Sequence, residues 1–186
     1  MGKRPFSSYL IAVVSLVLAG LATAQVLFFG PGDVVETLLW LGFALGLVWL
    51  GYVVPSAEIK NQQLVIVNPF RIAKISLGAI ENVDTRFALK VSGSFGKISA
   101  WAAPAPGRLR YRSHPTEDFR ALGLKEGQQV RPGDLPSTIS GSLAMQIRIA
   151  QKDEGELPRD VRISLNPLGI ALAVVPSLLL VVHYWT

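Results

Sequence analysis

Three long apolar stretches constrain this 186-residue chain more than any other feature. Tyr9 to Phe29 has no charged residue over 21 positions, and a helix of that length spans about 31 Å, the thickness of a bilayer's hydrocarbon core. Val34 to Val54 has one charge, Glu36, in its first turn, where a carboxylate can lie among lipid headgroups. Leu168 to Trp185 is charge-free, and its central Pro176 predicts a kink that a neighbouring helix accommodates. We therefore expect three transmembrane helices.

The distribution of basic residues predicts how these helices are oriented. Lys3 and Arg4 precede the first span, and the other 16 of the 18 Lys and Arg residues lie between Pro55 and Pro167. The connection from Gly30 to Asp33 has none, and neither does the C-terminus. Because basic residues favour the cytoplasmic side, we expect a multi-pass plasma-membrane protein with its N-terminus and central domain inside and its C-terminus outside. This topology explains the net charge of +5 better than nucleic-acid binding does.

The first 24 residues also fit a second interpretation, a signal peptide that is cleaved. Lys3 and Arg4 precede an apolar run from Leu10 to Leu21, and Ala22-Thr23-Ala24 has the small residues of a cleavage site. Apolar residues continue beyond that site to Phe29, which favours an uncleaved helix. Either interpretation leaves the orientation of the second and third spans unchanged.

The spans divide the chain into a helical hairpin over 1–55, a central domain over 56–166 and a third span over 167–186. The first part of the domain predicts an antiparallel meander of four to five short strands separated by turns. Turns are expected at Asn61-Gln62, at Asn68-Pro69-Phe70 and in the Gly-rich segment 91–96. The strands are expected within Glu58 to Lys60, Leu64 to Val67, Arg71 to Ser76, Ile80 to Val91, and Lys97 to Trp101.

The composition changes after Trp101. Positions 103–137 contain five Pro and four Gly residues, against one and three in the 46 residues from 56 to 101. This predicts a partly extended insert, in which Thr116 to Gly123 fits one or two capped helical turns. Apolar residues then recur at helical spacing, so we expect an amphipathic helix from Thr138 to Gln151 and a further strand from Val161 to Leu165.

Three segments of the central domain match a known pattern. Leu64 to Arg71 is an apolar strand that ends in Asn-Pro-x-Arg, Ile75 to Val83 contains Ile-x-x-Val, and Phe95 to Ala102 contains Gly-x-x-x-Ala-Trp-Ala. In these segments, and in the paired spans before them, the chain resembles bacterial membrane proteins with a pleckstrin-homology (PH)-like domain, particularly the actinobacterial family related to low-molecular-weight antigen 6. The resemblance covers roughly residues 56–103. It implies a partly open β-barrel or two packed sheets closed at one end by a helix, with no catalytic activity and no cofactor.

Five basic residues near predicted turns are candidates for contact with an anionic membrane surface. PH domains that hold phosphoinositides use basic residues around the first hairpin, but here the turn at 60–63 offers a single charge. Non-specific attraction, about 1 kcal/mol for each basic residue near anionic lipid, therefore fits better than a headgroup pocket. The candidates are Lys60, Arg71, Lys74, Lys90 and Lys97.

Three stripes of small residues at four-residue spacing are candidates for close helix packing. They either pack the spans on one another or contact a larger membrane complex or a second copy of the chain. Aromatic residues near the ends of the spans, Trp40, Trp49, Tyr52 and His183 to Trp185, are interpreted as interfacial anchors. The stripes are Ser15-Ala19-Thr23, Gly42-Gly46 and Gly169-Ala173-Ser177.

The residues available for chemistry favour a non-catalytic protein. The chain has no cysteine, and its two histidines, His114 and His183, are far apart in sequence, so we expect no metal and no cofactor. It also lacks a Gly-rich phosphate loop and the common hydrolase motifs. The first functional hypothesis is a scaffold or adaptor that binds a protein partner at the cytoplasmic membrane face. The alternatives are an accessory subunit of a larger membrane complex, such as a respiratory assembly, and a membrane-lipid sensor.

Overall fold

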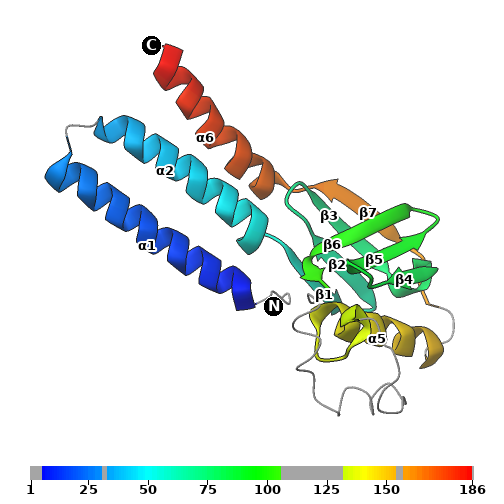
Figure 1. Ribbon diagram of the computed structural model, residues 1–186. Coiled ribbons are helices and arrows are strands. Elements are labelled where there is room, and N and C mark those ends of the chain that lie inside the picture. Colours follow the sequence, from blue (N-terminus) through cyan, green and yellow to red (C-terminus); the bar gives the residue numbers. More distant parts are fainter. Residues whose placement is uncertain (1–5, 31–32, 106–131, 154–156, 186) are drawn as a thin grey trace.

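The computed structural model describes residues 6–30, 33–105, 132–153 and 157–185 (Figure 1). Three helices are long and apolar enough to cross a membrane, as expected, and we call them the spans. They are α1 (Phe6–Phe29), α2 (Val34–Val48), which continues as the π-helix η1 (Trp49–Val53), and α6 (Pro167–Trp185). The helical turns predicted at 116–123 lie outside the described residues.

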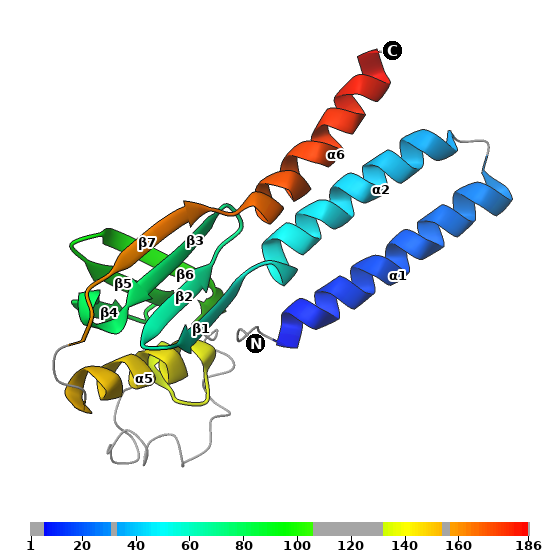
Figure 2. The ribbon, with the colours of Figure 1, turned by 180° about the vertical axis from the view of Figure 1, so that it is seen from behind.

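The spans form a layer in which α2 lies between α1 and α6 (Figures 1 and 2). Asp33 caps the start of α2, because its carboxylate accepts a hydrogen bond of 2.8 Å from the backbone N–H of Val35. The less exposed positions of α6 recur at helical spacing on one face, from Gly169 through Pro176 to Leu180. That face packs against α2, and α6 is a single helix through Pro176.

The central domain consists of two antiparallel sheets and one helix. The first sheet has the strand order β1-β2-β3-β7 and the second has the order β4-β5-β6. The predicted strands are therefore present, but they are divided between two sheets, and the strand after the helix joins the first sheet. The strands are β1 (Ser56–Lys60), β2 (Gln63–Val67), β3 (Arg71–Ser76), β4 (Asn82–Asp84), β5 (Ala88–Gly93), β6 (Gly96–Pro104) and β7 (Val161–Leu165).

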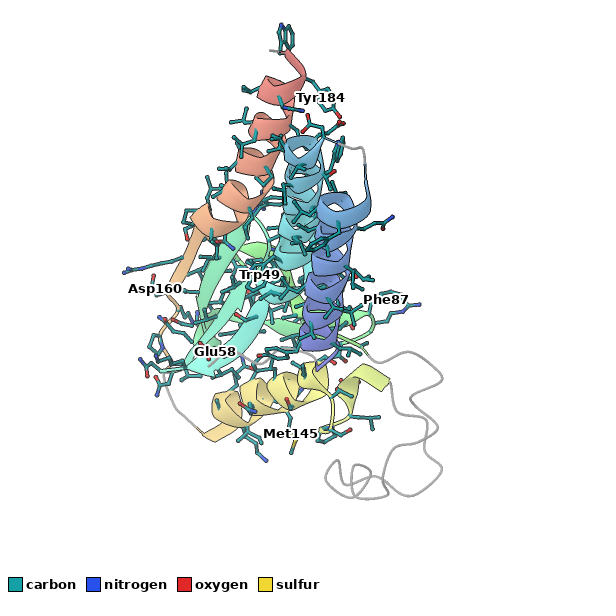
Figure 3. The ribbon with its side chains drawn as sticks, turned by 90° about the vertical axis from the view of Figure 1, so that its left-hand side faces the viewer. Trp49, Glu58, Phe87, Met145, Asp160 and Tyr184 are labelled. Atoms are coloured by element: carbon teal, nitrogen blue, oxygen red, sulfur yellow. The ribbon has the colours of Figure 1, made fainter. Side chains whose placement is uncertain are left out.

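The core of the domain lies between the two sheets and the helix α5 (Ile139–Asp153), which confirms the predicted amphipathic helix. Figure 3 shows Met145 of α5 and Tyr184 of α6 at opposite ends of the molecule. Gln151 holds α5 in place, because its side-chain amide donates to the carbonyl oxygens of Leu77 and Ile80 at 2.8 and 2.7 Å. The fully buried core side chains include Leu64, Ile66, Ile75, Leu89, Val91, Leu143 and Ile147.

The direction of each strand decides which end of the first sheet lies at the spans. β1 starts at Ser56, just after α2 and η1, and β7 ends at Leu165, just before α6. β2 pairs antiparallel with β1 and β3, so the turn from β2 to β3 also lies at the spans. The turn from β1 to β2 lies at the opposite end, where Asn61 and Gln62 both have positive φ (50° and 58°), as a tight hairpin requires.

One glycine permits a close approach between the spans and the domain. A Cβ atom placed on Gly169 would lie 1.6 Å from the carbonyl oxygen of Pro69, in the turn from β2 to β3. It would also lie 3.1 Å from Cδ1 of Leu50 in η1. A side chain at position 169 therefore forces α6 away from the domain.

We predict that Gly169→Val destabilises the purified chain in mild detergent. Overpacking of this kind costs about 1–3 kcal/mol, so the thermal unfolding temperature should fall. Gly42→Val is the matched control, because a Cβ atom on Gly42 meets no atom within 4 Å. Equal unfolding temperatures for the two variants would contradict the close contact at Gly169.

Candidate functional site: the junction of the spans and the domain

Asn166 connects the third span to the first sheet. Its backbone N–H donates to the carbonyl oxygen of Phe70, and its side-chain amide donates to the carbonyl oxygen of Asn68, both at 3.0 Å. Its side-chain oxygen accepts a hydrogen bond of 3.3 Å from the N–H of Gly169 and so caps the start of α6. The local sequence favours this cap, because Pro167 at the first helical position needs no hydrogen-bond partner for its nitrogen. Asn166 is buried, so its hydrogen bond to Gly169 is shielded from water.

Asn68 connects the two sheets. Its side-chain nitrogen donates to the carbonyl oxygen of Ser99 at 2.8 Å, and its side-chain oxygen accepts from the N–H of Trp101 at 2.9 Å. A primary amide presents a donor and an acceptor side by side, so it pairs with β6 as the backbone of a neighbouring strand would. The pairing brings together two of the segments that carry the PH-like resemblance. Sequence spacing contains no signal for this contact, because 31 residues separate Asn68 from Ser99.

The stripes of small residues lie in two different environments. Gly46 faces α6, because a Cβ atom there would lie 3.1 Å from the carbonyl oxygen of Leu172 and 3.6 Å from Cγ of Pro176. Gly42 is exposed and has open space around it. Gly169 contacts the domain as described above. The remaining members of the stripes are half-buried on faces that pack within the layer of spans: Ser15, Ala19, Thr23, Ala173 and Ser177.

The five basic candidates do not gather at one place. Arg71 follows the turn from β2 to β3 and lies at the spans, whereas Lys60 borders the turn at the opposite end of the same sheet. Lys74 is exposed in the middle of β3, and Lys90 and Lys97 are exposed on the second sheet. The first hairpin, which carries the headgroup site in phosphoinositide-binding PH domains, is therefore remote from the spans.

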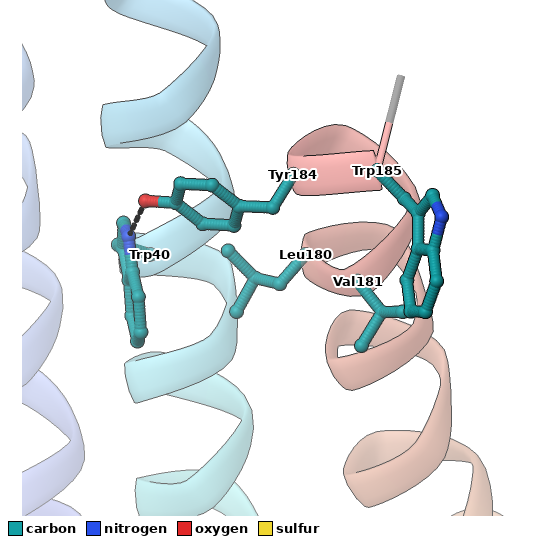
Figure 4. A pocket seen from close by; sticks show the side chains of 5 residues that line it. All are labelled: Trp40, Leu180, Val181, Tyr184 and Trp185. Atoms are coloured by element: carbon teal, nitrogen blue, oxygen red, sulfur yellow. Dashed lines mark hydrogen bonds between the residues drawn. The ribbon is translucent and has the colours of Figure 1, made fainter.

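An aromatic cluster lies at the opposite end of the spans, between α2 and α6 (Figure 4). The hydroxyl of Tyr184 accepts a hydrogen bond of 3.2 Å from Nε1 of Trp40 and donates to the carboxylate of Glu36. Residues that the sequence indicated as separate anchors thus form one chain of hydrogen bonds between two spans. Beside it is an open apolar groove of about 310 Å³ lined by Trp40, Leu180, Val181, Tyr184 and Trp185.

The strand β7 is the most exposed element of the central domain. It is an edge strand of its sheet, and all of its five residues except Val161 are exposed. The backbone N–H of Ser76 donates to the carbonyl oxygen of Asp160, and the backbone N–H of Asn166 donates to the carbonyl oxygen of Phe70. Because hydrogen-bonded pairs alternate along antiparallel strands, the even-numbered residues of β7 are those whose backbone groups bond to β3. The backbone groups of Val161, Ile163 and Leu165 consequently point toward the free edge.

Comparisons of the chain with protein-family models, with curated proteins and with solved structures found no match. Within the four described ranges, no group of three or more His, Asp or Glu side chains is placed to hold a metal ion. The junction and the edge of β7 are therefore the candidate functional features of the chain.

We predict that Asn68→Ala loosens the contact between the two sheets. Each hydrogen bond that Asn68 makes to β6 contributes about 1 kcal/mol, so the amide of Trp101 should exchange with deuterium about five- to tenfold faster. Hydrogen exchange with mass spectrometry of the full chain in nanodiscs measures this rate. Asn82→Ala on the exposed face of β4 is the control and should leave the exchange at Trp101 unchanged. An unchanged rate in Asn68→Ala would show that the amide does not connect the sheets.

Proposed function

We propose that this chain is a non-catalytic, membrane-anchored scaffold whose PH-like domain holds a protein partner at the cytoplasmic face of the plasma membrane. The observation that carries the proposal is the outer edge of β7, with which no strand of the described residues pairs; β7 is joined directly to a span through Asn166. Exposed edge strands pair readily with other chains, and folded proteins usually cover or shorten them. An edge left open beside a membrane is suited to binding an extended segment of a partner.

The arrangement of the domain supports the PH-like assignment. Two antiparallel sheets of four and three strands face each other across one core, and α5 packs against that core. This agrees with the two packed sheets and end helix that the resemblance implies. The cytoplasmic location is supported by the distribution of charge, since all 18 Lys and Arg residues precede the first span or lie between the second and third.

The chemistry of β7 indicates what kind of segment it binds. The side chains of Val161 and Ile163 form one apolar face, and the backbone groups of the same residues point to the outer edge. On the other face, Arg162 lies beside Lys74 of β3, and Arg162 is 3.3 Å from the carboxylate of Asp160. A complementary partner is an extended segment in which apolar residues alternate with acidic ones, because each added strand continues both faces of the sheet.

We predict that Ile163→Pro weakens capture of the partner by the full chain from native membranes. Proline removes the N–H that points to the free edge but leaves the hydrogen bonds between β7 and β3 intact. Loss of one or two backbone hydrogen bonds, about 1 kcal/mol each, should reduce the recovered partner roughly tenfold. Quantitative mass spectrometry after affinity purification gives the ratio.

Ser164→Ala is the matched control for this experiment. Ser164 is exposed on the same strand, and its backbone pairs with Ile72 of β3 rather than with a partner. Recovery should match that of the unmodified chain. Equal recovery from Ile163→Pro and Ser164→Ala would overturn the assignment of the β7 edge as the binding site.

A second candidate function, an accessory subunit of a larger membrane complex such as a respiratory assembly, is favoured by Gly42. This glycine is exposed on α2, and no atom of the described residues lies within 4 Å of its Cβ position, so another protein's helix can approach there closely. Gly46 does not serve this purpose, because α6 of the same chain occupies the space beside it. The lipid-sensor hypothesis has less support, because Lys60 and the first hairpin lie at the end of the sheet remote from the spans.

We predict that Gly42→Leu releases the chain from such a complex, because the larger side chain prevents close helix approach. Blue native electrophoresis of solubilised membranes separates the free chain from the assembly. Leu38→Ile changes an exposed residue one turn away on α2 without adding volume, and it should leave the complex intact. Co-purification that survives Gly42→Leu would exclude Gly42 as a subunit contact and would leave the β7 edge as the site of binding.

A further inference from the structure

We propose that the domain contacts the membrane surface directly through three apolar side chains, which insert into the lipid interface. They are Phe70, Trp101 and Leu165, which we call the collar. Their exposed fractions are 51%, 62% and 67%, so each presents most of a large apolar surface outside the protein core. They come from three different segments: the turn from β2 to β3, the strand β6 and the end of β7.

Hydrogen bonds place all three collar residues next to the start of α6. Phe70 accepts a hydrogen bond of 3.0 Å from the N–H of Asn166, and Leu165 directly precedes Asn166 in the chain. Trp101 is one step further away, because its N–H donates at 2.9 Å to Asn68, whose carbonyl oxygen accepts at 3.0 Å from the side chain of Asn166. The span α6 begins at Pro167, the next residue. The collar is therefore at the level where α6 leaves the bilayer.

The level of the collar identifies lipid as its occupant. Aromatic residues are enriched at membrane–water interfaces, where the ring meets the acyl chains while polar groups remain among the headgroups. The neighbouring η1 carries Trp49 and Tyr52, both exposed, so the second span presents aromatic side chains at the same end. Arg71 follows Phe70 directly and is exposed, which places a positive charge beside the phosphates. The first turn of α6 continues the same surface with Leu168, which is also exposed.

The contact made by the collar differs from the lipid contact that the basic residues suggested. A contact made by lysines would be weak, dependent on anionic lipid and sensitive to salt. A contact made by Phe70, Trp101 and Leu165 depends on burial of apolar surface and persists in neutral lipid and in high salt. It fixes which end of the first sheet faces the bilayer, and it leaves α5 and the first hairpin in water.

The absence of cysteine from the sequence permits a direct test with the full chain. Single variants Phe70→Cys, Trp101→Cys, Leu165→Cys, Leu168→Cys and Ile149→Cys are each labelled with a nitroxide and reconstituted into phosphatidylcholine vesicles. Leu168 in α6 is the reference for a site in lipid, and Ile149, exposed on α5, is the reference for a site in water. Electron paramagnetic resonance then compares collisions with oxygen, which concentrates in the bilayer, and with a water-soluble nickel chelate.

The expected result is that all three collar labels collide more with oxygen than with the chelate, as the Leu168→Cys label does, and that added salt changes nothing. The proposal is overturned if the labels at 70 and 101 behave like the Ile149→Cys label. It is also overturned if they are shielded from both reagents and show spin–spin broadening, because a second copy of the chain would then cover the collar. Labels at exposed side chains leave the backbone bonds of Asn68 and Asn166 in place, so the circular dichroism of each variant should equal that of the parent.

Discussion

The close contact between Gly169 and Pro69 is the constraint on which the rest of the structure depends. It places the first turn of α6 against the turn from β2 to β3, and Asn166 fastens the same two elements with hydrogen bonds. Leu50 of η1 completes the contact from the second span. The second and third spans, which join opposite edge strands of the first sheet, thereby both pack against the turn from β2 to β3, and we call this contact the lock. Without this lock, the links at residues 54–55 and 166 would act as hinges, and the domain would have no defined orientation to the membrane.

The lock has a consequence for the domain itself. The turn that receives α6 also carries Asn68, whose amide pairs with β6 and joins the two sheets. The same turn, Asn68 to Phe70, therefore both contacts the spans and joins the two sheets of the domain. A change in the separation of α2 and α6 would first displace this turn and then, through Asn68, displace β6. Coupling of this kind needs no long pathway, because only one side chain separates the span from the second sheet.

Local periodicity in the sequence predicted the elements but not how they assemble. The spans, the strands and α5 follow from unbroken apolar runs, from alternation and from helical spacing, because each of these patterns reflects one buried face. The same patterns do not say which strands share a sheet, so the expected meander proved to be two sheets, with β7 added to the first. Contacts made by single polar side chains over long sequence distances, such as Asn68 with Ser99, leave no periodic signal. The remote position of Lys60 follows from strand direction, because β1 starts at the second span and ends at Lys60.

The two edge strands of the first sheet, β1 and β7, lie in different environments, and this difference is the strongest argument for a binding role. β1 lies beside β6 of the second sheet, whereas β7 pairs with β3 alone among the strands that the structure describes. Because β7 leads into α6 after a single residue, its free edge is held close to the membrane surface. A partner that is itself anchored in the membrane meets this edge by diffusion in two dimensions, and tethering of both chains raises the effective concentration of one for the other. Under the proposed function, a short strand that would bind a soluble peptide weakly can therefore hold a partner that is anchored in the same membrane.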